Sequence, residues 1–102
     1  MAEEESDWNL VGPVLRQNEI SEAVIAAMVK ENSDLRLVRR GAYVRVFAAW
    51  KCQVTRAAIE NELYREFRFP TDLESIMPSF KGRLKISNQS AVWFFQKPGE
   101  IR

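Results

Sequence analysis

Residues 34–50 show a two-residue alternation of apolar and other side chains that is divided by Gly41. This period is typical of strands with one buried face, and a glycine between two such runs gives the backbone freedom that a tight hairpin needs. We therefore predict two antiparallel strands, Asp34–Arg40 and Ala42–Trp50. In the second strand, one face carries Tyr43, Arg45 and Phe47, and the other carries Val44, Val46 and Ala48.

Other stretches predict strands by the same criteria. Trp8–Arg16 is rich in large apolar residues, but Pro13 lacks a backbone N–H, so we expect an edge strand. Lys51–Thr55 predicts a short strand. Turn residues lie between Arg83–Ser87 and Ala91–Gln96, which predicts a final hairpin.

Polar capping residues precede two apolar stripes with helical spacing. Asn18 is predicted to cap a helix that ends near Asn32, and Thr55 a second helix. Thr71 and Glu74 match the capping box of a brief third helix. The stripes expected to be buried are Ile20, Ala23, Val24, Ala27 and Met28 in the first helix, and Ile59, Leu63 and Phe67 in the second.

The resulting order is β-α-β-β-β-α-α-β-β, with hairpins in place of repeated β-α crossovers. This order predicts an α+β fold: a compact single domain with antiparallel β-sheets, two main helices and one short helix. We expect the domain to span residues 8–97. Residues 1–7 are expected to form a disordered acidic tail, and residues 98–102 a C-terminal tail.

Composition excludes several classes of site. The chain of 102 residues has no histidine and a single cysteine, Cys52, so the usual zinc sites and Cys-His or Ser-His pairs cannot form. We expect Cys52 to be a small buried residue and predict no internal disulfide. The acidic side chains on the predicted helices are better explained as exposed charge pairs than as a catalytic pair. These are Glu60, Glu62, Glu66, Asp72 and Glu74.

Charge and hydropathy bear on partners and location. The net charge of +1 gives no strong field toward nucleic acid or an anionic membrane. No apolar run approaches the ~20 residues that span a bilayer, and the N-terminal MAEEESD lacks the pattern of a signal peptide. We therefore expect a cytoplasmic protein that binds neither nucleic acid nor membrane.

The basic and aromatic hairpin supports one alternative function. Arginines alternate with aromatic residues between Arg39 and Trp50, a combination that can bind single-stranded nucleic acid. An exposed hairpin face with arginine stems over aromatic rings explains the same pattern, and the balanced charge favours this explanation.

The stretch SIMPSFKGRL, Ser75–Leu84, has turn chemistry but carries large apolar side chains. Turns usually contain polar residues. Met77 and Phe80 therefore either fold back into a small core or are displayed for another protein to cover.

Four segments taken in order resemble one family: the small regulatory, or effector, proteins of soluble bacterial multicomponent diiron monooxygenases. The V-G-P and A-Y-V-R-V strands resemble most closely the branch of toluene and alkene monooxygenases. One departure is Leu63–Phe67, because the family often ends this helix with L-G-x-P-F. The matching segments are NLVGPVLR (9–16), RGAYVRV (40–46), VTRAAIENEL (54–63) and DLESIMPSFKGRL (72–84).

The resemblance implies a non-catalytic subunit that has no cofactor or metal of its own. Such a protein docks on the diiron hydroxylase component and tunes its conformation, turnover and coupling during hydrocarbon oxidation. It acts only indirectly with the ferredoxin and the reductase. The residues that the resemblance places in contact with the hydroxylase are Ile76, Met77, Pro78, Ser79, Phe80, Lys81 and Gly82.

Overall fold

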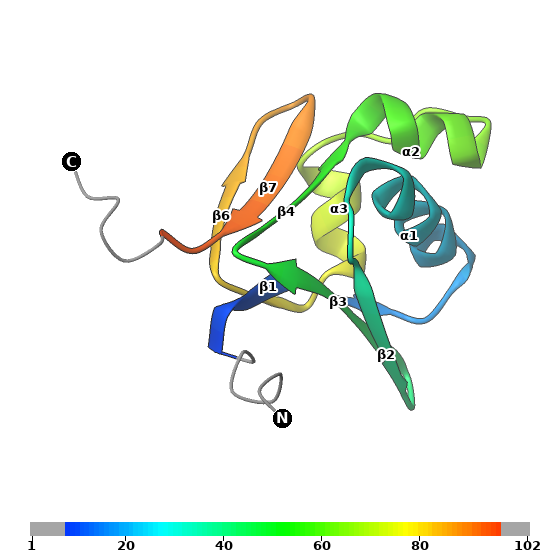
Figure 1. Cartoon of the computed structure of the whole chain (residues 1–102). Coiled ribbons are helices and arrows are strands. Elements are labelled where there is room, and N and C mark those ends of the chain that lie inside the picture. Colours follow the sequence, from blue (N-terminus) through cyan, green and yellow to red (C-terminus); the bar gives the residue numbers. More distant parts are fainter. Residues whose placement is uncertain (1–7, 97–102) are drawn as a thin grey trace.

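The computed structural model describes residues 8–96, in which seven strands and three helices follow one another (Figure 1). Both predicted tails, 1–7 and 98–102, lie outside the described residues. None of the helices in the described part is long and apolar enough to cross a membrane. The elements are β1 (Leu10–Arg16), α1 (Glu19–Glu31), β2 (Arg36–Arg40), β3 (Tyr43–Ala49), β4 (Lys51–Thr55), α2 (Arg56–Leu63), α3 (Thr71–Ile76), β5 (Ser79–Lys81), β6 (Arg83–Ile86) and β7 (Ser90–Phe94).

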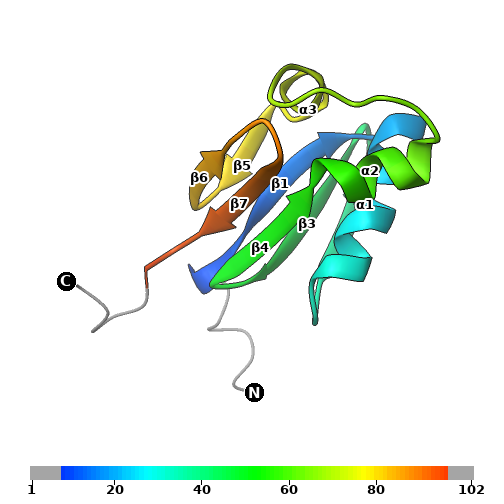
Figure 2. The same cartoon turned by 90° about the horizontal axis from the view of Figure 1, so that it is seen from above.

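The strands form two antiparallel sheets, with the orders β2-β3-β1-β5 and β4-β7-β6. Helices α1 and α2 lie next to each other beside β4 (Figures 1 and 2). The predicted α+β class with antiparallel sheets is confirmed. The additional strand is β5, which sequence reasoning had assigned to a turn.

Both predicted hairpins are present. Arg40 pairs with Tyr43 across Gly41, whose φ is 60°, and β6 pairs with β7. The predicted facing of β3 is also confirmed, because Val44, Val46 and Ala48 are buried while Tyr43 and Arg45 are exposed.

Strand β1 is not the edge strand that Pro13 suggested, because it lies between β3 and β5. It pairs with β3 before Gly12 and after Pro13, but these two residues themselves have no partner in β3. The missing N–H of Pro13 therefore removes no hydrogen bond from that pairing. Gly12 has a φ of 147°, and a Cβ there would lie 1.9 Å from the carbonyl oxygen of Val46. The close approach of the backbones explains the glycine.

Helices α1 and α2 begin at the predicted caps. The side chain of Asn18 accepts from the backbone N–H of Ser21, and that of Thr55 accepts from Ala58. Helix α2 ends at Leu63, however, so the predicted stripe is shorter than expected. Tyr64 closes the helix in the left-handed conformation, with a φ of 60°, where the related pattern has glycine.

The end of α2 places its apolar residues differently from the prediction. Ile59 is fully buried, whereas Leu63 is only partly buried. Phe67 is buried too, but from the loop that follows the helix. Glu60 holds this loop, because its carboxylate accepts from the backbone N–H of Phe67 at 2.9 Å.

The capping box predicted for α3 is not formed. Pro70 is the N-cap, no side chain caps the helix, and Thr71 is its first residue. The carboxylate of Asp72 instead accepts from the backbone N–H of Arg68 in the preceding loop. Pro70 has neither a backbone N–H nor a polar side chain, so an N-cap at this residue cannot form either hydrogen bond of a capping box.

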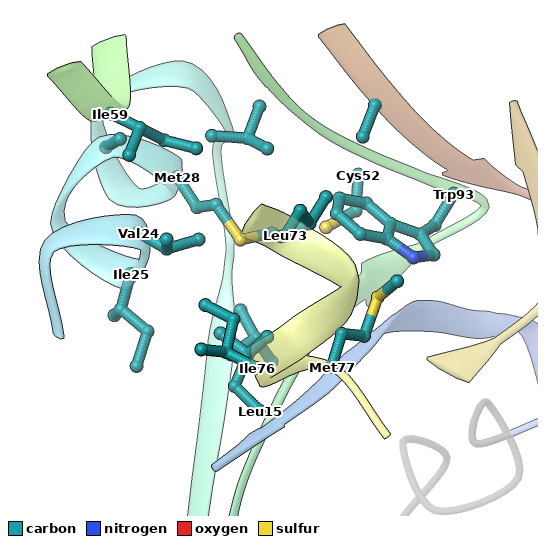
Figure 3. Packing of buried hydrophobic residues seen from close by; sticks show 14 of the residues in the cluster. Leu15, Val24, Ile25, Met28, Cys52, Ile59, Leu73, Ile76, Met77 and Trp93 are labelled. Atoms are coloured by element: carbon teal, nitrogen blue, oxygen red, sulfur yellow. The ribbon is translucent and has the colours of Figure 1, made fainter. Parts of the chain in front are cut away.

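The core lies between the helices and the inner faces of both sheets. Leu73 of α3 lies between Met28 of α1 and Trp93 of β7, while Ile76 lies near Leu15 and Met77, at the C-cap, lies near Trp93 (Figure 3). Cys52 is fully buried beside them, as predicted, and burial raises the pKa of its thiol to about 12. The thiol therefore stays protonated at neutral pH, which suits a packing role.

Candidate docking surface

The segment Ser75–Leu84 divides between the core and the surface. Ile76 and Met77 are buried, with exposed fractions of 5% and 8%, whereas Phe80 is 43% exposed. Pro78 and Ser79 are exposed, and Lys81 and Gly82 are half-buried. The predicted set of contact residues thus includes two side chains that already have partners inside the protein.

Strand pairing explains this division. Ser79, Phe80 and Lys81 pair with Val14, Pro13 and Gly12 of β1, so β5 forms the edge of the four-stranded sheet. Phe80 therefore lies on an edge strand that is open to solvent, whereas Ile76 and Met77 lie on the side of α3 and its C-cap that packs in the core.

Gly82 is the corner at which the chain leaves this sheet for the other one. Its φ is 99°, and a Cβ would lie 2.7 Å from Cγ1 of Val11 and 3.1 Å from the carbonyl oxygen of Phe94. These contacts come from β1 in one sheet and β7 in the other. A side chain has no room here, so the role of Gly82 is to let the sheets approach.

Phe80 and Lys81 share a hollow of about 270 Å³ with residues of the β2–β3 hairpin. The strand order explains this proximity, because only β1 lies between β5 and β3. The two features that the sequence showed separately, the apolar segment and the arginine-aromatic hairpin, therefore form one surface. We call it the docking face and define it by Pro13, Val14, Arg45, Phe47, Phe80 and Lys81.

A second hollow, of about 430 Å³, extends the docking face toward β2. Arg36 pairs with Phe47 and Arg40 with Tyr43, so both arginines lie on the same side of the sheet as Arg45. The guanidinium carbon of Arg45 lies 5.3 Å from the centroid of the Phe47 ring. Cationic and aromatic groups are thus interleaved, as in many protein and nucleic-acid interfaces.

Arg39 is the exception among the hairpin arginines. Its Nη1 donates to Glu22 of α1 at 2.6 Å and to Gln17 at 2.8 Å. Hydrogen bonding to Arg39 lowers the pKa of Glu22. Within the described residues, Arg36, Arg40 and Arg45 form no comparable ion pair. Among the described residues, carboxylates therefore neutralise the helix side of the hairpin but not its outer side.

This difference holds across the described chain. None of the strands contains an aspartate or glutamate, although most of them carry lysine or arginine. The outer surfaces of the sheets are therefore basic. The carboxylates gather on the helices, at Glu19, Glu22, Glu31, Glu60, Glu62, Asp72 and Glu74.

Several of these carboxylates form ion pairs or hydrogen bonds within the fold. Glu60 pairs with Arg56 at 2.9 Å, and Glu66 also contacts Arg56. Glu62 pairs with Lys30, so this charge pair joins α2 to α1. In residues 8–96, histidine, cysteine, aspartate and glutamate form no cluster of three or more that is arranged to hold a metal ion.

The structure is thus a small α+β domain with a basic and aromatic face on its four-stranded sheet. Residues 9–94 match the model of the MmoB/DmpM family, and the chain belongs to that family. The resemblance inferred from the four sequence segments is confirmed.

Individual relatives agree with this assignment. The chain is 38% identical over 95 residues to the effector subunit of the alkene monooxygenase system of Xanthobacter autotrophicus (strain ATCC BAA-1158 / Py2). The match covers 91% of this chain and 93% of the relative. The relative is thus named as an effector and not as a catalytic component.

Solved structures share the fold at lower identity. A phenol hydroxylase–regulatory protein complex contains a chain that matches with a TM-score of 0.77 and 20% identity, over 84% of this chain and 98% of that one. A second structure of such a complex matches with a TM-score of 0.73 and 21% identity, over 84% and 99% of the two chains. The soluble methane monooxygenase regulatory protein B matches with a TM-score of 0.68 and 20% identity, over 90% of this chain and 69% of that one.

Proposed function

We propose that this protein is the effector subunit of a bacterial multicomponent diiron monooxygenase and acts by docking on the hydroxylase component. One observation carries the proposal: the identity of 38% to an alkene monooxygenase effector, which extends over nearly the whole of both chains. The matched regulatory chains in phenol hydroxylase–regulatory protein complexes support the same mode of action.

The docking face is the surface that we assign to this contact. Phe80 provides an exposed aromatic anchor, and Pro78 narrows the conformations of the chain before it docks, which lowers the ordering cost. Lys81 and Arg45 place charge beside the anchor. The side chains of Ile76 and Met77 are buried, so we assign them the role of anchoring this segment to the core and not direct contact with the hydroxylase.

Binding alone is sufficient for regulation. A ligand that binds one conformation of its partner more tightly shifts the populations of the two conformations. A difference of about 1–3 kcal/mol changes these populations by about 5- to 150-fold. An effector can thus alter substrate access, turnover and coupling in the hydroxylase without contributing a reacting group.

Reconstitution tests the proposal. The hydroxylase and its electron-transfer components are assayed for product with increasing amounts of the purified effector. We expect turnover to rise and saturate, and the effector alone to form no product. Turnover that does not change when the effector is left out would overturn the proposal.

The nucleic-acid alternative and the location are tested separately. Titration with a generic single-stranded oligonucleotide at two salt concentrations should show no tight, salt-sensitive binding, because phosphate contacts weaken steeply with salt. A cytoplasmic location is part of the proposal, and the buried free thiol of Cys52 suits a reducing compartment. Cell fractionation checks it.

A further inference from the structure

A third hollow, of about 640 Å³, lies on the three-stranded sheet and is larger than either hollow of the docking face. Lysines from two strands lie at its margin, and aromatic and aliphatic side chains lie between them. We call it the basic groove. It is lined by Ala49, Trp50, Lys51, Lys85, Val92, Phe94, Phe95 and Gln96.

Strand register explains why this surface is both apolar and basic. Phe94 of β7 pairs with Lys51 on one side and Arg83 on the other, and Val92 pairs with Lys85. Paired residues share a face of an antiparallel sheet. The adjacent residue Trp93 is fully buried and therefore points to the core, so Phe94 and its cationic neighbours lie on the opposite, outer face.

The charges of the basic groove are uncompensated in the described part of the chain. Lys51 and Lys85, and Arg83 beside the groove, make no ion pair with a described carboxylate, and the strands that carry them contain no acidic residue. Like charges around an apolar centre favour an occupant that combines carboxylates with an apolar side chain.

The basic groove is continuous with the docking face. Leu10 borders the 430 Å³ hollow and pairs directly with Ala49, which borders the basic groove. The sheets join at Trp50, whose backbone N–H donates to the carbonyl oxygen of Asn9 and whose carbonyl accepts from Phe95. A protein seated on the docking face is therefore positioned to reach around this corner.

We propose that the basic groove binds an acidic surface segment of the same hydroxylase component, with an apolar side chain over Phe94 and Val92 and carboxylates beside Lys51 and Lys85. This inference rests on the proposed function. It extends the contact beyond the segment that the family resemblance indicates, and it specifies the chemistry of the hydroxylase surface that faces the groove.

A double charge reversal, Lys51→Glu with Lys85→Glu, tests the inference. Both side chains are exposed, so the thermal midpoint should stay near that of the wild type. Calorimetric titration against the purified hydroxylase at low salt should show affinity reduced about tenfold or more, and the reduction should shrink as salt is added. The milder pair Lys51→Gln and Lys85→Gln should give a smaller loss in the same direction.

The matched control is Arg65→Glu with Arg68→Glu, which changes net charge by the same amount. These exposed arginines lie in the α2–α3 connection, outside both surfaces. We expect its affinity to remain within about threefold of the wild type, since only long-range charge is altered. Equal losses of affinity in the two charge reversals would mean that net charge alone determines binding to the hydroxylase, and would overturn the inference.

Phe80→Ala separates failure of this inference from failure of the proposed function. If Phe80→Ala loses affinity while the Lys51/Lys85 reversal binds like the wild type, the basic groove is not a contact and the proposed function stands. If the wild-type protein does not bind the hydroxylase at all, the proposed function fails and the inference fails with it.

Discussion

Met77 and Phe80 lie three residues apart but belong to different regions of the molecule. Met77 caps α3 and packs in the core near Trp93 (Figure 3). Phe80, in contrast, lies on the edge strand β5 with 43% of its surface exposed. Pro78 separates them, and Gly82 then carries the chain into the second sheet. One short segment thus supplies the core from its first half and the docking face from its second.

This contrast shows how a small domain can expose an apolar side chain and still keep a packed core beneath it. A domain of this size buries a smaller fraction of its surface than a large one, so its core is small. An exposed aromatic side chain must therefore be held in place by the few buried residues near it. The support here consists of β1 on one side and the buried residues Ile76 and Met77 just before it in the chain. We therefore expect substitutions in the two halves to affect different properties.

The largest effect is expected for Met77→Ala. Truncating a buried methionine leaves a cavity and costs about 2–5 kcal/mol of unfolding free energy. Denaturant titration of the isolated protein measures this loss. Below the unfolding transition, affinity for the hydroxylase should change little. A variant that unfolds like the wild type but fails to bind would place Met77 in the contact and break the contrast.

Gly82→Ala tests the corner between the two regions. Its positive φ and the 2.7 Å approach to Val11 predict a loss of about 1–3 kcal/mol in stability. Gly41→Ala is the control, because Gly41 also has a positive φ but a Cβ there would meet nothing within 4 Å. Thermal unfolding should rank Gly82→Ala as the more destabilised. The reverse ranking would mean that the sheets do not constrain this residue.

Phe80→Ala should produce the opposite pattern to Met77→Ala. We expect a loss of about 2 kcal/mol in binding, or about 30-fold in affinity, because exposed aromatic anchors dominate many interfaces. Unfolding should shift by less than about 1 kcal/mol, since much of the ring is already in water. Calorimetry and denaturant titration measure the two quantities. If the variant unfolds at a lower denaturant concentration but still binds and saturates the hydroxylase normally, the ring contributes to the core and not to the contact.

Lys81→Ala should have the smallest effect. A cation near the margin of an interface influences mainly the association rate and its dependence on salt. Stopped-flow mixing with the hydroxylase should show association slowed by a few-fold at low salt and an almost unchanged dissociation rate. A large increase in the dissociation rate would show that Lys81 lies at the centre of the contact.

Local patterns predicted much of this fold. The alternation around Gly41 identified the β2–β3 hairpin with its correct facing, and Asn18 and Thr55 identified the starts of α1 and α2. Each of these signals depends on residues close together in the sequence. The predicted α+β class followed from them.

The errors arose where distant residues decide the structure. Pro13 suggests an edge, but β1 becomes internal because β5 pairs with it from almost 70 positions away. Tyr64 adopts a conformation that usually favours glycine, so no local signal marked the end of α2.

The docking face could not be derived from local patterns either. The resemblance indicated Phe80 and Lys81, and the hairpin pattern indicated Arg45 and Phe47, but for different functions. Only the strand order, with β1 between β3 and β5, joins them into one surface. Burial likewise separates Met77 from Phe80, although the sequence presents both as apolar residues in one segment.

Site-specific photo-crosslinking tests the docking face most directly. A p-benzoylphenylalanine replaces Phe80 in one variant and Tyr64 in another, because Tyr64 is 92% exposed but lies outside the docking face. After irradiation with the purified hydroxylase, we expect a covalent adduct from position 80 and none from position 64. An adduct from position 64 with none from position 80 would contradict the assignment of the docking face.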